Sequence, residues 1–490
     1  MAPALCFMKR RSVRQGTLAV LLLLATSGCA TSVNRYALID QSLMAGDPSR
    51  AATIIEKAKD EYGSESRVLY EMDRGLVLHL AGDYQASNDV LEQAKDEVEK
   101  LYTRHLTTET KAFLTHDAKQ PYEGAPYERT MINVIKALNY AAMQNWTEAL
   151  VEARQIDDRL NVLADRTSQK YGYRDDAFAR YLSGILFEIA GELNDAFIAY
   201  RKAYEEYRHV GSWSHVSVPA SLKEDLLRVT DALHLTDEHE AYKKEFPNVV
   251  WRPAGETKTL GQIVVISYNG RSPHKDDMFI DAPVSLDALN LVILSKTMGN
   301  GQYSNPNRRA VDSVLYGLNG HVVRVAIPTV VAQKTQVAYG QVKAVGSSGT
   351  YTATTQLVQN FTTLAERTLS DQLPGIAVKA VARAVVKYGM AEGVGRGAHA
   401  AAGKDAGPLV GIIVGSLAKA WAVASEEADK RSWRTLPDEI QIARLWVPAG
   451  DYQIQMQSTS RQGGIAGRES SRTISIRGGE ARVMTERVVP

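Results

Sequence analysis

The chain has 490 residues, of which 57 are Lys or Arg and 56 are Asp or Glu, so its formal net charge at pH 7 is +1. Such a balance gives no global attraction to nucleic acid. The composition, 44% hydrophobic and 23% charged, is that of an ordinary folded protein, and domains of about 100–200 residues would divide it into two to four. With Cys6 and Cys29 as its only cysteines, the chain has neither a disulfide framework nor a cysteine-based zinc site.

The first 28 residues have the organisation of a secretory signal. Basic residues from Lys9 to Arg14 precede an apolar run, Leu18 to Ala25, that is too short to span a bilayer as a mature helix. Small residues, Thr26-Ser27-Gly28, then lead to Cys29. We expect residues 1–28 to be a signal peptide and residues 29–34 to be an anchor and tether.

The end of this segment resembles the bacterial lipobox, apart from Thr26 at the position that Leu usually holds. The resemblance implies that the signal is cleaved before Cys29, that the Cys29 thiol is diacylated, and that the new amino terminus is acylated as well, for example with palmitate. Ala30, which follows the cysteine, favours the outer membrane. The alternative is an ordinary signal peptide with an incidental cysteine.

Residues 35–246 contain a repeated helical pattern. In GILFEIAGELNDAFIAYRKAYEEYR, which begins at Gly184, small residues recur where two antiparallel helices would touch. RGLVLHLAGDYQASNDVLEQA and KALNYAAMQNWTEALVEARQI repeat the pattern, LIDQSLMAGDPSRAATIIEKA is a degenerate first copy, and residues 221–246 are expected to cap the array. This half resembles the tetratricopeptide-repeat family, which implies a curved solenoid that binds peptides or proteins. The alternative is a helical scaffold with no ligand.

A polar segment, HLTTETKAFLTHDAKQPYEGAPYERTM, interrupts the repeats. Insertions in a solenoid often lie on its binding face. We therefore consider a partner-binding site made of Tyr122, Tyr127, Glu128 and Arg154, in which Glu128 faces Arg154 if the third hairpin folds as expected. The alternative interpretation is a structural ion pair, with the tyrosines as packing residues.

The helical period ends near Pro247, where proline and glycine residues interrupt the sequence, and we place a β domain at residues 247–490. GQIVVISYNG, HVVRVAIPTVV, TQVAYGQVKAV and TYTATTQLVQ have the composition of strands. EIQIARLWVPAGDYQIQMQS predicts two strands joined at residues 448–451, and TISIRGGEARVMTERV predicts a hairpin that turns at Gly478-Gly479. The expected fold class is α+β: an all-α tetratricopeptide-like solenoid followed by an antiparallel β-sandwich-like domain.

A helical hairpin is expected as an insertion in the β domain, at about residues 360–430. Lys379, Arg383 and Lys387 recur every four residues, which places a basic stripe on an otherwise apolar helix. This stripe is a candidate contact with a membrane or a partner. The second helix has only about ten apolar residues before Lys419, fewer than a bilayer span needs. We therefore favour a hairpin packed on the sandwich or buried in an oligomer over one inserted in the membrane.

Motifs of catalysis are incomplete in this sequence. There is no HExxH and no GxSxG, and Gly403-Lys404 lacks the remainder of a phosphate-binding loop. Ser416-Leu417-Ala418-Lys419 matches SxxK, but its SDN and KTG partners are missing. We expect no enzymatic activity, no cofactor and no metal site.

The whole chain is similar to a family of bacterial lipoproteins with tetratricopeptide-like repeats and a C-terminal β domain. The resemblance runs through AGDYQAS, PYEGAPYE and RSWRTLPDEIQIARLWVPAG. It implies an outer-membrane location facing the periplasm and partners among other envelope proteins, such as CsgG-like or penicillin-binding-protein-activator-like lipoproteins. The expected function is a lipid-anchored envelope adaptor or scaffold; the alternative is a structural subunit of an oligomeric outer-membrane or periplasmic assembly.

Overall fold

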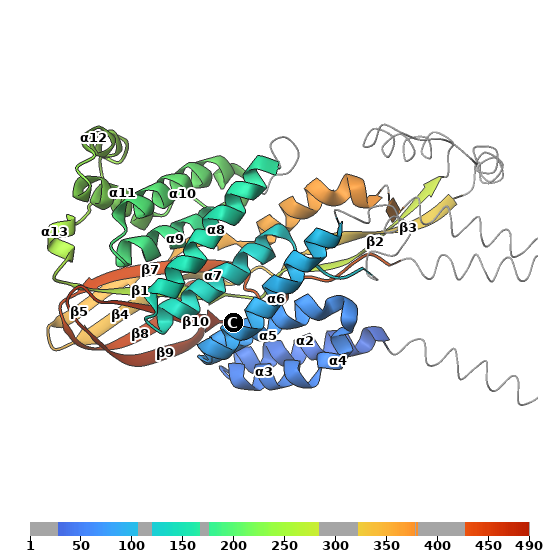
Figure 1. Ribbon diagram of the computed structural model, residues 1–490. Coiled ribbons are helices and arrows are strands. Elements are labelled where there is room, and N and C mark those ends of the chain that lie inside the picture. The colour runs from blue at the N-terminus through green and yellow to red at the C-terminus, as the bar shows by residue number, and fades with distance from the viewer. Residues whose placement is uncertain are drawn as a thin grey trace, which may run out of the picture.

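The computed structural model describes residues 28–105, 120–166, 176–283, 322–377, 379–380 and 427–489. Helices occupy the first half of the chain and strands most of the second (Figure 1). The labelled helices are α2 (Gly28–Met44), α3 (Pro48–Lys57), α4 (Lys59–Tyr62), η1 (Ser64–Ser66), α5 (Arg67–Ala81), α6 (Tyr84–His105), α7 (Pro126–Ala142), α8 (Trp146–Arg166), α9 (Ala177–Ile189), α10 (Leu193–Ser214), α11 (Ala220–Ala232), α12 (Thr236–Glu245) and α13 (Ala254–Thr257). A further helix occupies residues 361–377.

Within the described ranges, five helical hairpins follow one another, and each turns in the same way. The turn of each contains one residue in the left-handed region, with φ between 56° and 82°: Gly46, Gly82, Gln144, Gly191 and His234. The N–H of the next residue then donates to a carbonyl five residues back, as Asp83 does to Leu78. This bond satisfies a carbonyl that the ending helix leaves without a partner. We call these five hairpins the helical array.

Small residues lie where the paired helices cross, as the sequence predicts. A Cβ at Gly75 would overlap Leu91 of the facing helix, and a Cβ at Gly184 would overlap the ring of Tyr200. In the third predicted copy, Ala137 and Ala153 are completely buried. The prediction of tetratricopeptide-like helical hairpins is therefore confirmed by the helices and their crossings.

Over the residues that the structure describes, the strands form two four-stranded sheets and one two-stranded ribbon. The inner sheet has the order β10-β1-β7-β6, the outer sheet has the order β5-β4-β8-β9, and β2 and β3 form the ribbon. The strands are β1 (Gly261–Asn269), β2 (His274–Pro283), β3 (Val322–Val331), β4 (Val337–Gly346), β5 (Gly349–Thr354), β6 (Gln356–Asn360), β7 (Glu439–Val447), β8 (Gly450–Ser460), β9 (Ile465–Ile476) and β10 (Ala481–Val488).

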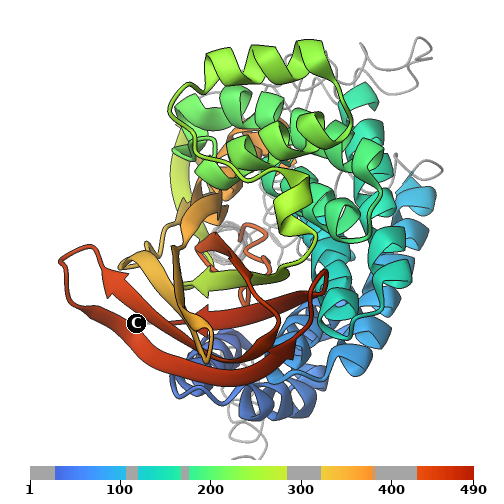
Figure 2. The same ribbon diagram turned by 90° about the vertical axis from the view of Figure 1, so that its left-hand side faces the viewer.

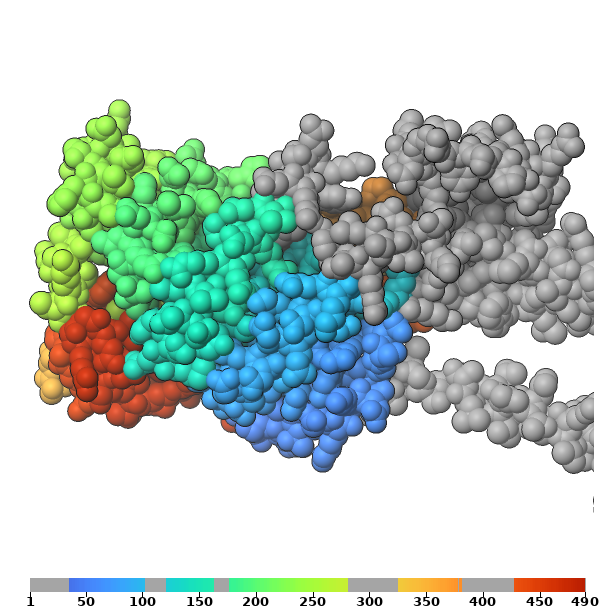
Figure 3. Space-filling model, in the orientation of Figure 1, coloured from blue at the N-terminus to red at the C-terminus, as the bar shows by residue number. Residues whose placement is uncertain are grey.

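The inner sheet lies between the helical array and the outer sheet. Successive residues of a strand point to opposite faces. Accordingly, Val264 and Ile266 of β1 belong to the core shared with the helices, whereas Ile263 and Val265 belong to the core shared with the outer sheet. Figure 2 shows the helices as an arc around the strands, and Figure 3 shows how the helices cover one face of the molecule.

Two features of the expected sandwich are wrong. The chain does turn at Gly478-Gly479, but β9 pairs with β8 in the outer sheet and β10 pairs with β1 in the inner sheet, so these strands form no hairpin. The pairing of β10 with β1 is parallel, so the inner sheet is mixed rather than antiparallel. β10 separates from its sequence neighbour β9 and forms the edge of the inner sheet beside the helices. The helices, the inner sheet and the outer sheet thus form three layers with shared cores.

Candidate functional site

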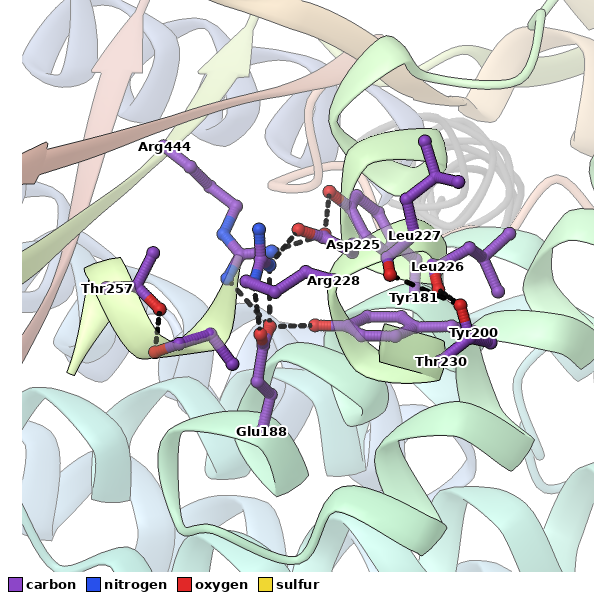
Figure 4. A network of polar contacts seen from close by, with 11 residues as sticks. Tyr181, Glu188, Tyr200, Asp225, Leu226, Leu227, Arg228, Thr230, Thr257 and Arg444 are labelled. Atoms are coloured by element: carbon purple, nitrogen blue, oxygen red, sulfur yellow. Dashed lines mark hydrogen bonds and ion pairs between the residues drawn. The ribbon is translucent and has the colours of Figure 1, made fainter. Parts of the chain in front are cut away.

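A buried cluster of four charged residues joins the helical array to the inner sheet (Figure 4). Glu188 lies near the end of α9, Asp225 and Arg228 lie on α11, and Arg444 reaches in from β7. Arg228 Nε donates to Glu188 Oε1 at 2.6 Å, and Arg444 Nη2 donates to Glu188 Oε2 at 3.0 Å. Both arginines also pair with Asp225. We call this group the charge cluster.

Two tyrosines complete the charge cluster. The Tyr200 hydroxyl donates to Glu188 at 2.6 Å, and the Tyr181 hydroxyl donates to Asp225 at 2.9 Å. Burial would raise the pKa of Glu188, but Arg228 and Arg444 outweigh burial and lower the pKa to about 2. Glu188 therefore stays ionised at neutral pH. Two cations and two anions neutralise one another here, so the cluster is suited to fixing β7 against α9 and α11 rather than to proton transfer.

A second connection is made by residues 427–438, an extended segment that we call the strap. Trp433 N donates to Glu128 of α7 at 2.8 Å, and Thr435 Oγ1 donates to Asp73 of α5 at 2.9 Å. Asp73 also accepts from the hydroxyls of Tyr36 and Tyr62, at 2.7 and 2.8 Å. Burial raises the pKa of Asp73. These carboxylates hold the chain that leads into β7 against the first half of the array.

The structure separates the residues that we considered as one partner-binding site. Tyr122, Tyr127 and Glu128 are 7%, 5% and 1% exposed. Glu128 accepts from Tyr122 Oη at 2.5 Å and from Ala125 N at 2.7 Å. These contacts agree with the alternative in which the tyrosines are packing residues. Their role as a docking surface has no support in this conformation.

The expected pairing of Glu128 with Arg154 is wrong. Arg154 Nη2 instead binds both carboxylate oxygens of Glu192, at 2.7 and 2.6 Å, because α8 turns Arg154 toward the next hairpin while Glu128 points at the strap. The Arg154 side chain is 50% exposed. Of the four predicted residues, Arg154 is therefore the one that a partner can reach.

Arg154 lies beside a hollow of about 600 Å³ on the surface of the array, which we call the Arg154 hollow. The turns before α8 and α10 and the turn between β9 and β10 meet here, and Gln144 Nε2 donates to Glu480 Oε1 at 3.0 Å. Its lining is apolar at Trp146, Leu150 and Ile189 and charged at Arg154, Glu192 and Glu480. Sequence reasoning found Arg154 but not the hollow, because its walls come from three distant segments.

Of the remaining predicted residues, Lys379 and Cys29 lie within the described ranges. Lys379 lines a smaller hollow of about 350 Å³ with Lys275, Asp371 and Asp429. Arg383 and Lys387 lie outside the described residues, as does most of the predicted helical insertion; a helix over residues 361–377 leads into it. Cys29 is in the first turn of α2.

The described residues contain neither a candidate membrane span nor a candidate metal site. None of the described helices is both long enough and apolar enough to cross a bilayer. Nor do the described histidines, cysteines, aspartates and glutamates gather anywhere in groups of three that could hold a metal ion.

No family model matches the sequence, and no curated protein matches it. Among solved structures, MamA AMB-1 is 11% identical and has a TM-score of 0.27, with 45% of this chain and 92% of that chain covered. A kinesin light chain of Podospora anserina with nearly identical TPR-like repeats is 13% identical and has a TM-score of 0.29, with 44% and 93% covered. The Rap conjugation gene regulator of plasmid pLS20, in complex with the Phr* peptide, is 12% identical and has a TM-score of 0.27, with 50% and 60% covered. At these scores the repeat assignment rests on the helical hairpins themselves.

Proposed function

We propose that this chain is a lipid-anchored scaffold of the bacterial envelope, and that its helical array binds another envelope protein at the Arg154 hollow. The proposed binding site rests on a contrast between two faces of the helical array. Its inner face is filled by the protein's own inner sheet, whereas the Arg154 hollow is open. The inner face of a solenoid is the surface that such arrays commonly use for binding. A partner of this array therefore binds on a surface other than this inner face.

The chemistry of the Arg154 hollow suits a protein segment with an apolar side chain. Trp146, Leu150 and Ile189 offer apolar contact area, and Arg154 and Glu192 offer one charge of each sign. Aromatic residues and arginine carry much of the energy of protein interfaces. The partly exposed Arg154–Glu192 pair contributes little stability to the fold, so it can be exchanged for contacts with a partner at small cost.

The anchoring half of the proposal is supported by the lipobox-like residues 26–29. Several acyl chains on Cys29 would each contribute about 0.8 kcal/mol per buried methylene, which suffices for stable attachment. The family resemblance favours a location at the outer membrane, on its periplasmic side. It also favours CsgG-like or penicillin-binding-protein-activator-like lipoproteins as partners. We propose a scaffold without enzymatic activity; in the charge cluster, both carboxylates are bound by arginines, which suits a structural role for that cluster.

The binding site is tested by a photo-crosslinking amino acid at position 151. Val151 is 38% exposed and lies one turn of α8 from both Thr147 and Arg154, which line the hollow; Val345 of the outer sheet, 37% exposed, is the matched control. We expect a specific envelope-protein adduct from position 151 that disappears when Arg154→Glu is added, and no such adduct from position 345. The same adduct from both positions, or an adduct that survives Arg154→Glu, would contradict the proposed site.

The anchor is tested by labelled palmitate. Cys29→Ser is expected to abolish incorporation and to release the protein from the membrane fraction, whereas Cys6→Ser is expected to change neither. Incorporation that survives Cys29→Ser would contradict the anchor. Size measurement in detergent separates the scaffold, expected as a monomer, from the alternative of a structural subunit in a large oligomer.

A further inference from the structure

The ribbon exposes three consecutive large apolar side chains. Met278, Phe279 and Ile280 of β2 are 42%, 52% and 41% exposed. Their neighbours across the ribbon, Ile327, Ala326 and Val325 of β3, are 7%, 2% and 1% exposed. One strand of the ribbon is therefore covered and the other is open. We call residues 278–280 the apolar edge.

An open strand of this composition needs a partner. In the part of the chain that the structure describes, β2 pairs with β3 alone, so its outer backbone groups form a free edge. Free edges are usually protected by charges, and consecutive exposed apolar residues mark contact sites. Successive residues point to opposite faces, so the apolar edge is apolar on both sides of the ribbon.

The position of the ribbon indicates what the apolar edge touches. In Figure 1 the ribbon projects from the right-hand end of the molecule, and the first turn of α2, which contains Cys29, lies at the same end. If Cys29 is acylated, as proposed above, a membrane that holds the acyl chains also faces the ribbon.

The charges beside the apolar edge argue against two other occupants. Asp276 is exposed, Asp277 pairs with Lys430 at 2.8 Å, and Lys275 adjoins them, so the charges beside the apolar residues balance and give no attraction to an anionic surface. A second copy of β2 added antiparallel and centred on Phe279 would set Asp277 directly opposite Asp281 of that copy. Like charges placed opposite each other destabilise a strand pair.

We propose that the apolar edge is a second membrane contact, which places Met278, Phe279 and Ile280 in the interfacial region of a bilayer of neutral lipid. This inference rests on the proposed lipid anchor for the orientation of the molecule. The anchor supplies attachment, and the ribbon fixes which way the helical array faces relative to the membrane. Acyl chains alone leave a protein free to rotate about its tether.

The contact can be measured with a single environment-sensitive dye. Because the chain has only two cysteines, Cys6→Ser and Cys29→Ser leave Phe279→Cys as the sole thiol for labelling. Val250→Cys, at a position 86% exposed, is the control. An amino-terminal histidine tag holds the full chain on vesicles of zwitterionic lipid doped with nickel-chelating lipid, which removes any dependence on acylation.

We expect dye emission at position 279 to rise severalfold on vesicles and to be quenched by nitroxide placed just below the lipid headgroups, with no change at position 250. Unchanged emission at position 279 on the tethered protein would overturn the inference. A rise that depends on protein concentration without vesicles would overturn it too, in favour of a second copy. Failure of the anchor is a separate result, because it is read from palmitate incorporation at Cys29.

Discussion

The inner and outer sheets each have four strands, yet their strands are buried to very different degrees. All nine residues of β1 in the inner sheet are buried, including Gln262, Ser267 and Asn269. In β5 of the outer sheet, exposed and half-buried residues fill all six positions. The difference arises because the inner sheet is covered by the helical array on one face and by the outer sheet on the other. The inner sheet thus belongs to the core of both halves of the molecule.

The same contrast applies to charges. Arg444 of β7 is 4% exposed and binds two buried carboxylates, whereas Arg472 of β9 is 48% exposed and binds Glu486 at 3.3 Å. A buried charge left without its partner costs far more than an exposed one. The two sheets should therefore respond very differently to the loss of an arginine.

The largest expected effect is that of Arg444→Met. Removal of the guanidinium leaves Glu188 and Asp225 buried with one cation between them, and we expect the free energy of unfolding to fall by about 3–5 kcal/mol. Arg472→Met in the outer sheet is the matched control, with a loss of about 0–1 kcal/mol. Urea denaturation measures both. Equal losses would contradict the difference between the two sheets.

Gly184→Leu tests the close crossing of α9 and α10, the helices that supply Glu188 and Tyr200. A Cβ at this position already overlaps Tyr200, so we expect a loss of about 1–3 kcal/mol or more from overpacking. Gly255, which has open space around its Cβ position, is the control for the added side chain. A melting temperature that is the same for Gly184→Leu and the natural chain would refute the crossing.

The pH dependence of stability tests the burial of Glu439, which lies where the inner sheet meets the outer sheet. Glu439 of β7 is buried beside Arg461, and burial, together with Asp438, raises its pKa to about 7. The folded state therefore binds the proton of the Glu439 carboxyl group more tightly than the unfolded state does. The stability that this protonation contributes is lost as the pH rises from about 4.5 through 7. Between pH 5.5 and 7.5 we expect a loss of about 2 kcal/mol.

Glu439→Gln should remove this part of the pH dependence. Burial lowers the pKa of His79 to about 4, which destabilises the folded state as the pH falls below 6.5. Because both proteins contain His79, its contribution cancels in the difference between them. Parallel pH profiles of the two proteins would show that Glu439 is ionised normally.

The smallest expected effect concerns the basic stripe of the predicted insertion. Lys379 lies half-buried in the smaller hollow, so its charge is only partly available to a membrane surface. We expect Gln at positions 379, 383 and 387 together to leave flotation with anionic vesicles unchanged. Flotation that requires anionic lipid and disappears in the triple variant would instead make the stripe a membrane contact.

Local features of the fold could be predicted from the sequence, and distant pairings could not. Gly75 and Gly184 mark helix crossings by their spacing, and GQIVVISYN shows a strand by its composition. The pairing of β10 with β1 joins residues more than 200 positions apart, and no local pattern encodes it. The turn at Gly478-Gly479 suggested a hairpin, because its sequence specifies the turn but not which sheet each strand joins.

The candidate site shows the same limit. Glu188 stands in GILFEIAG, where an acid among apolar residues signals a buried partner, but nothing in the sequence identifies Arg228 or Arg444 as that partner. Asp73 and Thr435 meet across 362 positions. Tyr122 and Glu128 stood out because they cluster in a polar segment, which is also what a binding loop looks like. The burial of Tyr122 and Glu128, where Glu128 binds the strap, is a tertiary effect.

Hydrogen exchange shows whether the inner sheet permanently fills the helical array, as we claim. We expect the amides of β1 and β7 to exchange as slowly as those of α9, at the rate of global unfolding, and those of β5 and β9 to exchange faster. Exchange of β1 and β7 that is faster than exchange of α9 would show that the strands leave the array while the helices stay folded. That result would contradict the claim, because the inner face of the array would then be open to a partner.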